Sequence, residues 1–188
     1  MKMIRMTLAL LLALSLPAGS RAAADDGHDR DGRRLSARLI GYEEVPAVST
    51  PARGSFTAKV SKEDDMIDYT LTFGGLTGTV QQSHIHIAQP GVNGSIVIWL
   101  CQTATTPAPA TVAALTPFCP APGGEVSGTI TAANVITAGT ASQQIVAGEL
   151  AEVLAAIRAG VAYVNVHATP LNPGGEIRGQ IRTSGDKN

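Results

Sequence analysis

The sequence predicts an all-β fold, an antiparallel β-sandwich of about eight strands with Greek-key connections and one short amphipathic helix. Three observations lead to this prediction. Short runs in which apolar and polar residues alternate recur after residue 35. Clusters of Gly, Pro, Asn and Asp separate these runs, as is typical of the turns between sandwich strands. One segment, near residue 150, instead has the period of a helix.

The first 24 residues have the features of a signal peptide. Lys2 and Arg5 give a positive start, an apolar run follows over 8–16, and Ala22-Ala23-Ala24 resembles a cleavage site. The apolar run is shorter than the ~20 residues of a membrane span. We therefore expect an exported chain, periplasmic or secreted, with no membrane span in the mature protein.

The rest of the chain is long enough for one domain with its own core. Residues 25–34 are dense in charge and poor in apolar residues, which predicts a flexible leader. Residues 35–183 are predicted to form the β-sandwich, and 184–188 a tail. After cleavage the chain has 11 basic and 15 acidic residues, a net charge of −4. This balance predicts no nucleic-acid partner.

Five strands are expected in the first half of the domain, over residues 35–42, 54–60, 66–73, 83–87 and 95–100. The second and third alternate clearly between apolar and polar residues, and the polar segment between them has the length of a hairpin loop. A glycine-rich turn precedes the fourth strand. A Pro-Gly-Val-Asn-Gly turn leads into the fifth, which is almost continuously apolar.

Three further strands are expected over 124–132, 161–169 and 176–183, and a helix precedes the second of these. Between Leu150 and Ile157 the apolar residues follow the i, i+3, i+4, i+7 spacing, with acidic residues in the first turn and Arg158 in the last. Gly160 can adopt the left-handed conformation that ends a helix. We expect this helix to pack against the sandwich.

Three of the four histidines lie in two predicted strands. His84 and His86 must project from one face of their strand, because side chains alternate. Asn165 and His167 share a face of the second strand in the same way. If the two strands are neighbours, three imidazoles and an amide converge on one patch of a sheet. The fourth histidine, His28, lies in the charged leader.

The predicted patch has two interpretations. His84, His86 and His167 could hold copper or zinc, since imidazole nitrogens lie ~2.0–2.1 Å from such metals and three of them leave an open position. Such binding would weaken as the pH falls through ~6.5, the ordinary histidine pKa. Alternatively, the imidazoles form a structural hydrogen-bond network with backbone groups, Asn165 or Glu176.

Cys101 and Cys119 are the only cysteines, and they bracket a Pro-, Ala- and Thr-rich segment. In an oxidising compartment such a pair is expected to form a disulfide, which would stabilise the fold by about 3 kcal/mol. Thiolate ligands beside the histidines are the alternative.

Charged residues flank the predicted sheet at two places. Glu176 and Arg178 share a face of the last strand, where an ion pair, or Arg178 binding to loop carbonyls, would fix the strand. Recognition of a ligand carboxylate by Arg178 is the functional alternative. Asn165 could hold a neighbouring turn. Glu43 and Glu44 follow the first strand and are expected to be solvated.

Several motifs together resemble the CHRD domain, a repeat first recognised in chordin and found also in secreted bacterial proteins. They extend over most of the predicted domain: Leu39 to Pro46, His84-Ile85-His86, Gly91 to Gly94, Gly128-Thr129, the helix ending at Gly160, Tyr163 to His167, and Gly174 to Ile181. Chordin antagonises bone morphogenetic proteins, but that activity does not transfer to a lone domain behind a bacterial-type signal.

Two classes of function fit the sequence. The first is an exported, non-catalytic binding or structural module of the cell envelope or extracellular space, whose partner is a protein, a glycan or an envelope component. The second is a copper- or zinc-binding metalloprotein, with redox activity as a further option. No nucleophile–base pair, phosphate loop or cofactor fingerprint supports another enzyme class, so we expect no enzyme activity.

Overall fold

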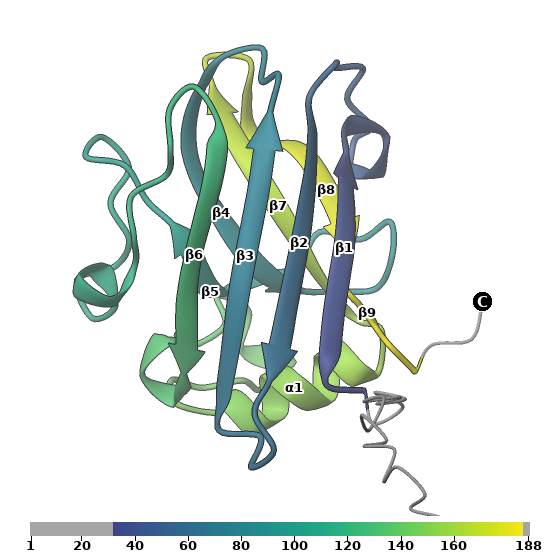
Figure 1. Cartoon of the computed structure of the whole chain (residues 1–188), viewed down its shortest axis with the longest axis vertical. Helices are drawn as coiled ribbons and strands as arrows, with labels where there is room; N and C mark the ends of the chain where they lie inside the picture. Colours follow the sequence, from purple (N-terminus) through teal and green to yellow (C-terminus); the bar gives the residue numbers. More distant parts are fainter. Residues whose placement is uncertain (1–31, 186–188) are drawn as a thin grey trace, which may run out of the picture.

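Two antiparallel layers of strands form the part of the protein that the computed structural model describes, residues 32–185 (Figure 1). The strands are β1 (Arg34–Ile40), β2 (Arg53–Val60), β3 (Met66–Gly74), β4 (Thr79–Ile87), β5 (Ser95–Cys101), β6 (Gly124–Thr131), β7 (Ala162–Thr169), β8 (Asn172–Gln180) and β9 (Arg182–Thr183). The helix α1 spans Leu150–Arg158, and short 3-10 turns span Gly41–Glu43, Ala113–Leu115, Ala132–Asn134 and Ala141–Gln143. The predicted signal peptide and most of the predicted leader lie outside the described residues.

The strands follow the order β5-β4-β7-β8-β1-β2-β3-β6, and β9 pairs with β1. In Figure 1, β1, β2, β3 and β6 form one layer and the strands β4, β5, β7 and β8 lie behind it. The layers meet where Ile40 of β1 pairs with Arg178 of β8. Since β6 returns from β5 to lie beside β3, the connection has Greek-key character. The predicted antiparallel sandwich is confirmed.

The core lies between the two layers. Leu39, Phe56 and Leu71 of one layer and Val164 and Ile177 of the other are fully buried members of one apolar cluster. Alternation along each strand places these side chains inside, because successive residues point to opposite faces.

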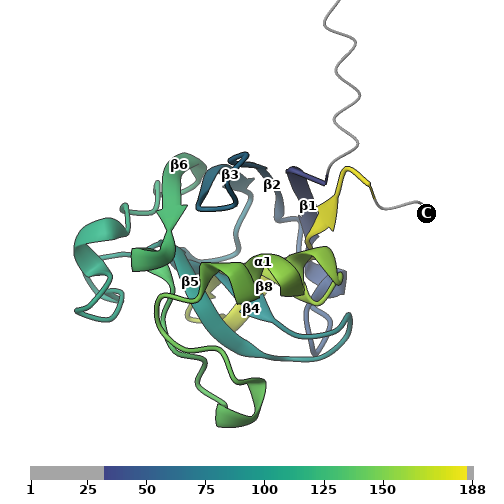
Figure 2. The same cartoon turned by 90° about the horizontal axis from the view of Figure 1, so that it is seen from below.

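The predicted helix is confirmed and closes one end of the sandwich (Figure 2). Its apolar residues at the predicted spacing are all buried in the core: Leu150, Val153, Leu154 and Ile157. Gly160 has φ +72°, the left-handed conformation expected after the last turn.

Strand boundaries differ from the prediction mainly at the carboxy-terminal strand. The expected strand 176–183 is two strands: β8 begins at Asn172 and ends at Gln180, and β9 starts at Arg182. The expected run 83–87 is the second half of the longer β4. Both extensions pair with neighbouring strands, since Thr79 pairs with Thr169 and Asn172 with Ala168.

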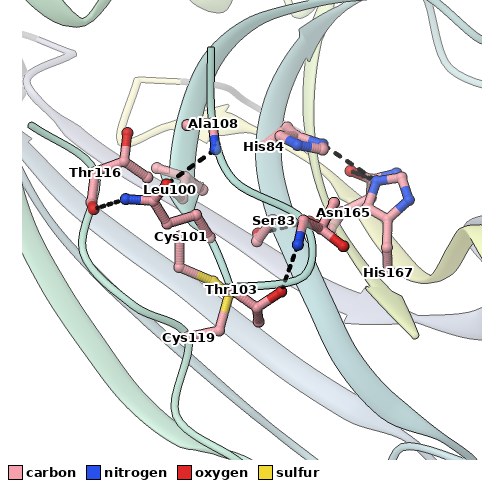
Figure 3. Close-up of a disulfide and its surroundings, with 12 residues drawn as sticks. Ser83, His84, Leu100, Cys101, Thr103, Ala108, Thr116, Cys119, Asn165 and His167 are labelled. Carbon is pink, nitrogen blue, oxygen red and sulfur yellow. Dashed lines mark hydrogen bonds between the residues drawn. A yellow bond between two sulfur atoms is a disulfide. The ribbon is translucent and has the colours of Figure 1, made fainter. Parts of the chain in front are cut away.

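The two cysteines form the predicted disulfide, which joins the end of β5 to the segment before β6 (Figure 3). The side chain of Gln102 holds the bridged loop from inside. Its amide donates to the carbonyls of Ala113 and Thr116, and its oxygen accepts from the Ala108 N–H. Within residues 32–185, no helix has the length and apolar character needed to cross a membrane.

The outer face of the β4-β7-β8 layer is also buried, under three loops. Opposite the apolar core residues, this face carries His84, His86, Asn165, His167, Glu176 and Arg178, all buried. The loops attach through these side chains. His86 contacts the Gly94 carbonyl, and Glu176 contacts Thr50 and Thr77. His167 contacts the carbonyl of Pro173, at the start of β8. The sandwich therefore has a second, polar interior.

Candidate metal centre

The histidine cluster consists of His84, His86 and His167, and it forms because β4 and β7 are neighbours. In the antiparallel register His84 pairs with Asn165, and Gln82 pairs with His167. One ring nitrogen from each histidine lies within 4.8 Å of those of the other two. Figure 3 shows His84 and His167 pointing toward one another beside Asn165. The structure thus brings together the predicted residues, and metal binding by them stays a prediction.

Two of the imidazoles have a defined orientation. His86 Nδ1 lies 2.9 Å from the Gly94 carbonyl oxygen, and His167 Nδ1 lies 2.9 Å from that of Pro173. Because a carbonyl only accepts hydrogen bonds, both Nδ1 atoms carry a proton. In the neutral rings the Nε2 lone pairs then point into the cluster. Metal-binding histidines are held in this way by a backbone carbonyl.

His84 has a different environment. Its Nδ1 lies 3.2 Å from His167 Nε2, and its Nε2 is buried without a hydrogen-bond partner among the described residues. The His84 ring meets the indole of Trp99 edge-on, with centroids 4.3 Å apart and planes at 76°. Trp99 pairs with His84 across β4 and β5. Trp99 was not among the predicted site residues, although its position on an apolar strand beside the histidine run was visible.

Asn165 completes the cluster. Its Oδ1 lies 3.1 Å from His86 Nε2 and 3.0 Å from His167 Nε2. An amide oxygen and two nitrogen lone pairs are all acceptors, so an amide placed in this way needs a proton or a cation between them. An amide turned by 180° would instead donate from Nδ2 to both rings. Of the two roles expected for Asn165, holding a turn and bonding the imidazoles, these contacts correspond to the second.

Burial keeps the imidazoles neutral. The three side chains are 0%, 7% and 6% exposed for His84, His86 and His167. Desolvation lowers the pKa of His86 to about 4 and lowers that of His167. Desolvation, followed by the charges of His167 and His86, lowers the pKa of His84 well below 6.5. Proton competition for these nitrogens therefore begins at a lower pH than the predicted ~6.5.

The size of the cluster is close to that of a metal site. Two nitrogens at ~2.1 Å from one ion are at most about 4.2 Å apart. The widest separation among the three ligand nitrogens is no more than 4.8 Å. Three nitrogens placed symmetrically around the ion are about 3.6 Å apart, so the widest pair must approach by up to roughly 1.2 Å, through side-chain rotations, for all three to bind one ion.

Arg178 holds the loop that covers the cluster, as predicted. It donates to the carbonyl oxygens of Val92 at 2.9 Å and Gln89 at 3.4 Å, and to Asn93 Oδ1 at 3.3 Å. Its guanidinium carbon lies 3.4 Å from the ring centroid of Tyr163. Arg178 is 1% exposed, so it cannot bind a ligand carboxylate from solvent.

Tyr163 lies between Arg178 and the histidines. Its ring is stacked on that of His86, with centroids 4.6 Å apart and planes at 7°. Desolvation raises the pKa of the Tyr163 hydroxyl, so it stays neutral. Arg178, Tyr163 and His86 thus form one continuous stack.

Glu176 has a structural role of a different kind from those expected. Its Oε1 accepts from the Thr50 hydroxyl at 2.6 Å and from the Thr77 N–H at 2.8 Å. It therefore fixes two loops to β8, in place of the predicted pairing with Arg178 or with the histidines.

Glu44 is buried, although the sequence predicts a solvated side chain. Glu43 is exposed as expected, but Glu44 is 6% exposed. Desolvation raises the pKa of Glu44 to about 7, although the Arg178 charge acts in the opposite direction. Its carboxylate lies against Gly175, where a Cβ would collide with Glu44 Oε1. The sequence gives one indication that Glu44 is not an ordinary surface residue: it lies inside the Leu39 to Pro46 motif.

The fold and the site place the chain in one class of protein, antiparallel β-sandwiches that bury a histidine–asparagine cluster beneath their loops. The particular family follows from comparison with known proteins: the CHRD domain model matches residues 35–181. The chain belongs to the CHRD domain family, which confirms the resemblance seen in the motifs. No curated protein and no solved structure matched the chain.

Proposed function

We propose that this protein is an exported, non-catalytic CHRD domain that binds one copper or zinc ion through His84, His86 and His167. One observation carries the proposal: backbone carbonyls fix two imidazoles so that both Nε2 atoms lie beside Asn165 Oδ1, and a ring nitrogen of each of the three histidines lies within 4.8 Å of the others. Nitrogen donors suit copper and zinc, whereas calcium and magnesium prefer oxygen.

The burial of the centre supports a non-catalytic role. A substrate would need to reach the bound ion, but the three imidazoles lie beneath loops that Arg178 and Glu176 hold in place. The signal-like residues 1–24 and the disulfide support export, since disulfides persist in oxidising compartments.

Titration calorimetry of the mature protein with Cu²⁺ and with Zn²⁺ tests the proposal. We expect one ion per chain at pH 7, and His84→Ala and His167→Ala should each abolish tight binding. His28→Ala is the matched control, because it removes a histidine from outside the domain. The metal site would be refuted if the two cluster variants bound metal as tightly as wild type, or if wild type bound neither of these ions nor Cu(I).

A second candidate function is attachment to an extracytoplasmic protein, glycan or envelope component. The loop between the cysteines carries no charged residue, and it exposes Leu115 at 48% and Phe118 at 70%. The disulfide and Gln102 hold this loop in one conformation. Cosedimentation with isolated envelope material tests this function. Phe118→Ser should weaken it, whereas Tyr42→Ser, at another exposed aromatic residue, should not.

A further inference from the structure

We infer that the histidine centre selects Cu(I) over Cu(II) and Zn(II). This preference rests on the proposed metal-binding function and adds the identity and oxidation state of the ion. It follows from three properties of the centre: the charge of its donors, its burial, and the number of strong ligands it offers.

All of the donors are neutral. The ligand group in the described residues consists of three histidines and contains no Asp, Glu or Cys. A fourth group, the amide oxygen of Asn165, contacts the Nε2 atoms of His86 and His167 and is also neutral. A bound ion would therefore keep its full formal charge. Imidazole accepts both copper and zinc, so the donor type alone does not decide between them.

The nearest charged side chains do not supply the missing negative charge. Glu44 lies against Gly175, and the Arg178 guanidinium acts on its carboxyl group. Arg178 itself stacks on Tyr163, whose other neighbour in the stack is His86. Glu176, the third buried charged side chain of this face, accepts hydrogen bonds from Thr50 and Thr77. Two carboxyl groups and one guanidinium leave at most one negative charge beside the centre, too little to neutralise a divalent ion, and no carboxylate belongs to the ligand group.

Burial then favours the ion of lower charge. His84 is fully buried, and His86 and His167 are nearly so, between the sheet and its covering loops. The cost of moving an ion from water into a medium of low dielectric constant grows with the square of its charge. A divalent ion therefore costs about four times as much as a monovalent one in this centre.

Coordination number acts in the same direction. Zn²⁺ held by three imidazoles takes a water or another ligand in a fourth position. Here the rings of Trp99 and Tyr163 pack against His84 and His86, which limits the room for water. Cu(I) has a filled d shell and is satisfied by three nitrogen donors, so the cluster can hold it without a water or another fourth ligand.

Competition titrations of the mature wild-type protein test the preference. Cu(I) is measured anaerobically against bathocuproine disulfonate, and Zn²⁺ and Cu²⁺ are measured against chelators of known affinity. We expect Cu(I) to bind more tightly than either divalent ion by at least roughly 100-fold. Equal or tighter binding of Zn²⁺ or Cu²⁺ overturns the preference and leaves the metal site standing. If none of the three ions binds, the proposed function also fails.

Asn165→Asp supplies an independent test, because it places a carboxylate beside the nitrogens of His86 and His167. An anionic ligand should raise Zn²⁺ affinity more than Cu(I) affinity and so reduce the preference at least roughly tenfold. Asn134→Asp is the control: it adds the same charge at a buried asparagine that caps a 3-10 turn after β6. An unchanged preference in folded Asn165→Asp, or an equal change in Asn134→Asp, contradicts the electrostatic reason. The wild-type titrations decide the preference if Asn165→Asp does not fold.

Discussion

The imidazole of His84 meets the indole of Trp99 edge-on, with ring centroids 4.3 Å apart. Trp99 is the only tryptophan in the chain, so its fluorescence reports on one side of the histidine cluster. Neither ring has a hydrogen-bond partner for its buried Nε atom among the described residues. An ion bound at His84 would therefore lie close to the indole of Trp99.

Cu²⁺ bound in the centre should quench Trp99 fluorescence. Its partly filled d shell accepts excitation energy over short distances, whereas Zn²⁺ has a filled shell and should leave most of the emission. The measurement is an emission titration at neutral pH. In His84→Ala the stoichiometric quenching should disappear. Quenching that persists in this variant would place the copper elsewhere.

Arg178→Ala should destabilise the fold. The guanidinium is buried and donates to three loop acceptors, so its removal leaves those groups without partners and costs roughly 1–3 kcal/mol. Arg178→Lys should recover only part of this, because lysine lacks the planar fork. Chemical denaturation measures both. The exposed Arg38→Ala on β1 is the control, and an equal effect there would exclude a specific role for Arg178.

Gly175→Ala should destabilise the start of β8, which carries Pro173, the hydrogen-bond partner of His167. Gly175 has φ +133°, and a Cβ at this position would collide with Glu44 Oε1. Both the strained backbone and the collision act against the variant. Gly174→Ala is the matched control, because nothing lies within 4 Å of a Cβ there. Thermal unfolding should separate the two, and equal midpoints would contradict the close approach of Glu44 to Gly175.

The apo protein should lose stability as the pH falls below 6.5. Burial lowers the pKa of the three cluster histidines, that of His86 to about 4, so the unfolded chain binds more protons in this range. Stability is therefore lost from pH ~6.5 downward, by up to about 1.4 kcal/mol per pH unit for each histidine. A flat pH profile in chemical denaturation would contradict burial of neutral rings.

Glu44 should change the stability in the opposite direction over an overlapping pH range. Its folded-state pKa is raised from 4.5 to about 7, so the folded protein binds the extra proton and stability falls as the pH rises through this interval. Glu44→Gln removes this contribution and should steepen the acid destabilisation caused by the histidines. Chemical denaturation of wild type and Glu44→Gln across this pH range gives the free energy of unfolding at each pH, and the difference between them is the contribution of Glu44. Identical pH profiles would contradict the burial of a titrating Glu44.

Intact mass should establish the covalent state of the exported protein. We expect loss of the first 22–24 residues from a periplasmic or secreted sample, as the residues before Asp25 predict. The mass should also be lower by two hydrogens for the Cys101–Cys119 bridge. Full-length protein with two free thiols would contradict both export and oxidation.

The sequence by itself determined the all-β class, the helix that ends before Gly160, the disulfide pair and the shared face of His84 and His86. These features depend on local periods and on chain neighbours, which a sequence displays directly. The family followed from motifs of the same kind. The start of β8 was predicted too late, because its first residues, from Asn172 to Gly175, have turn-like composition and pair only through tertiary contacts.

The tertiary structure alone decided what covers the polar face of the sheet. Glu44 is far from Arg178 in sequence and looked like a solvated residue, yet loop packing buries it and raises its pKa. The same packing places the carbonyls of Gly94 and Pro173 on two imidazoles and so fixes their tautomers. Burial and long-range hydrogen bonds arise from the packed loops and not from the local pattern, which is why the sequence could indicate the histidines but not their charge state.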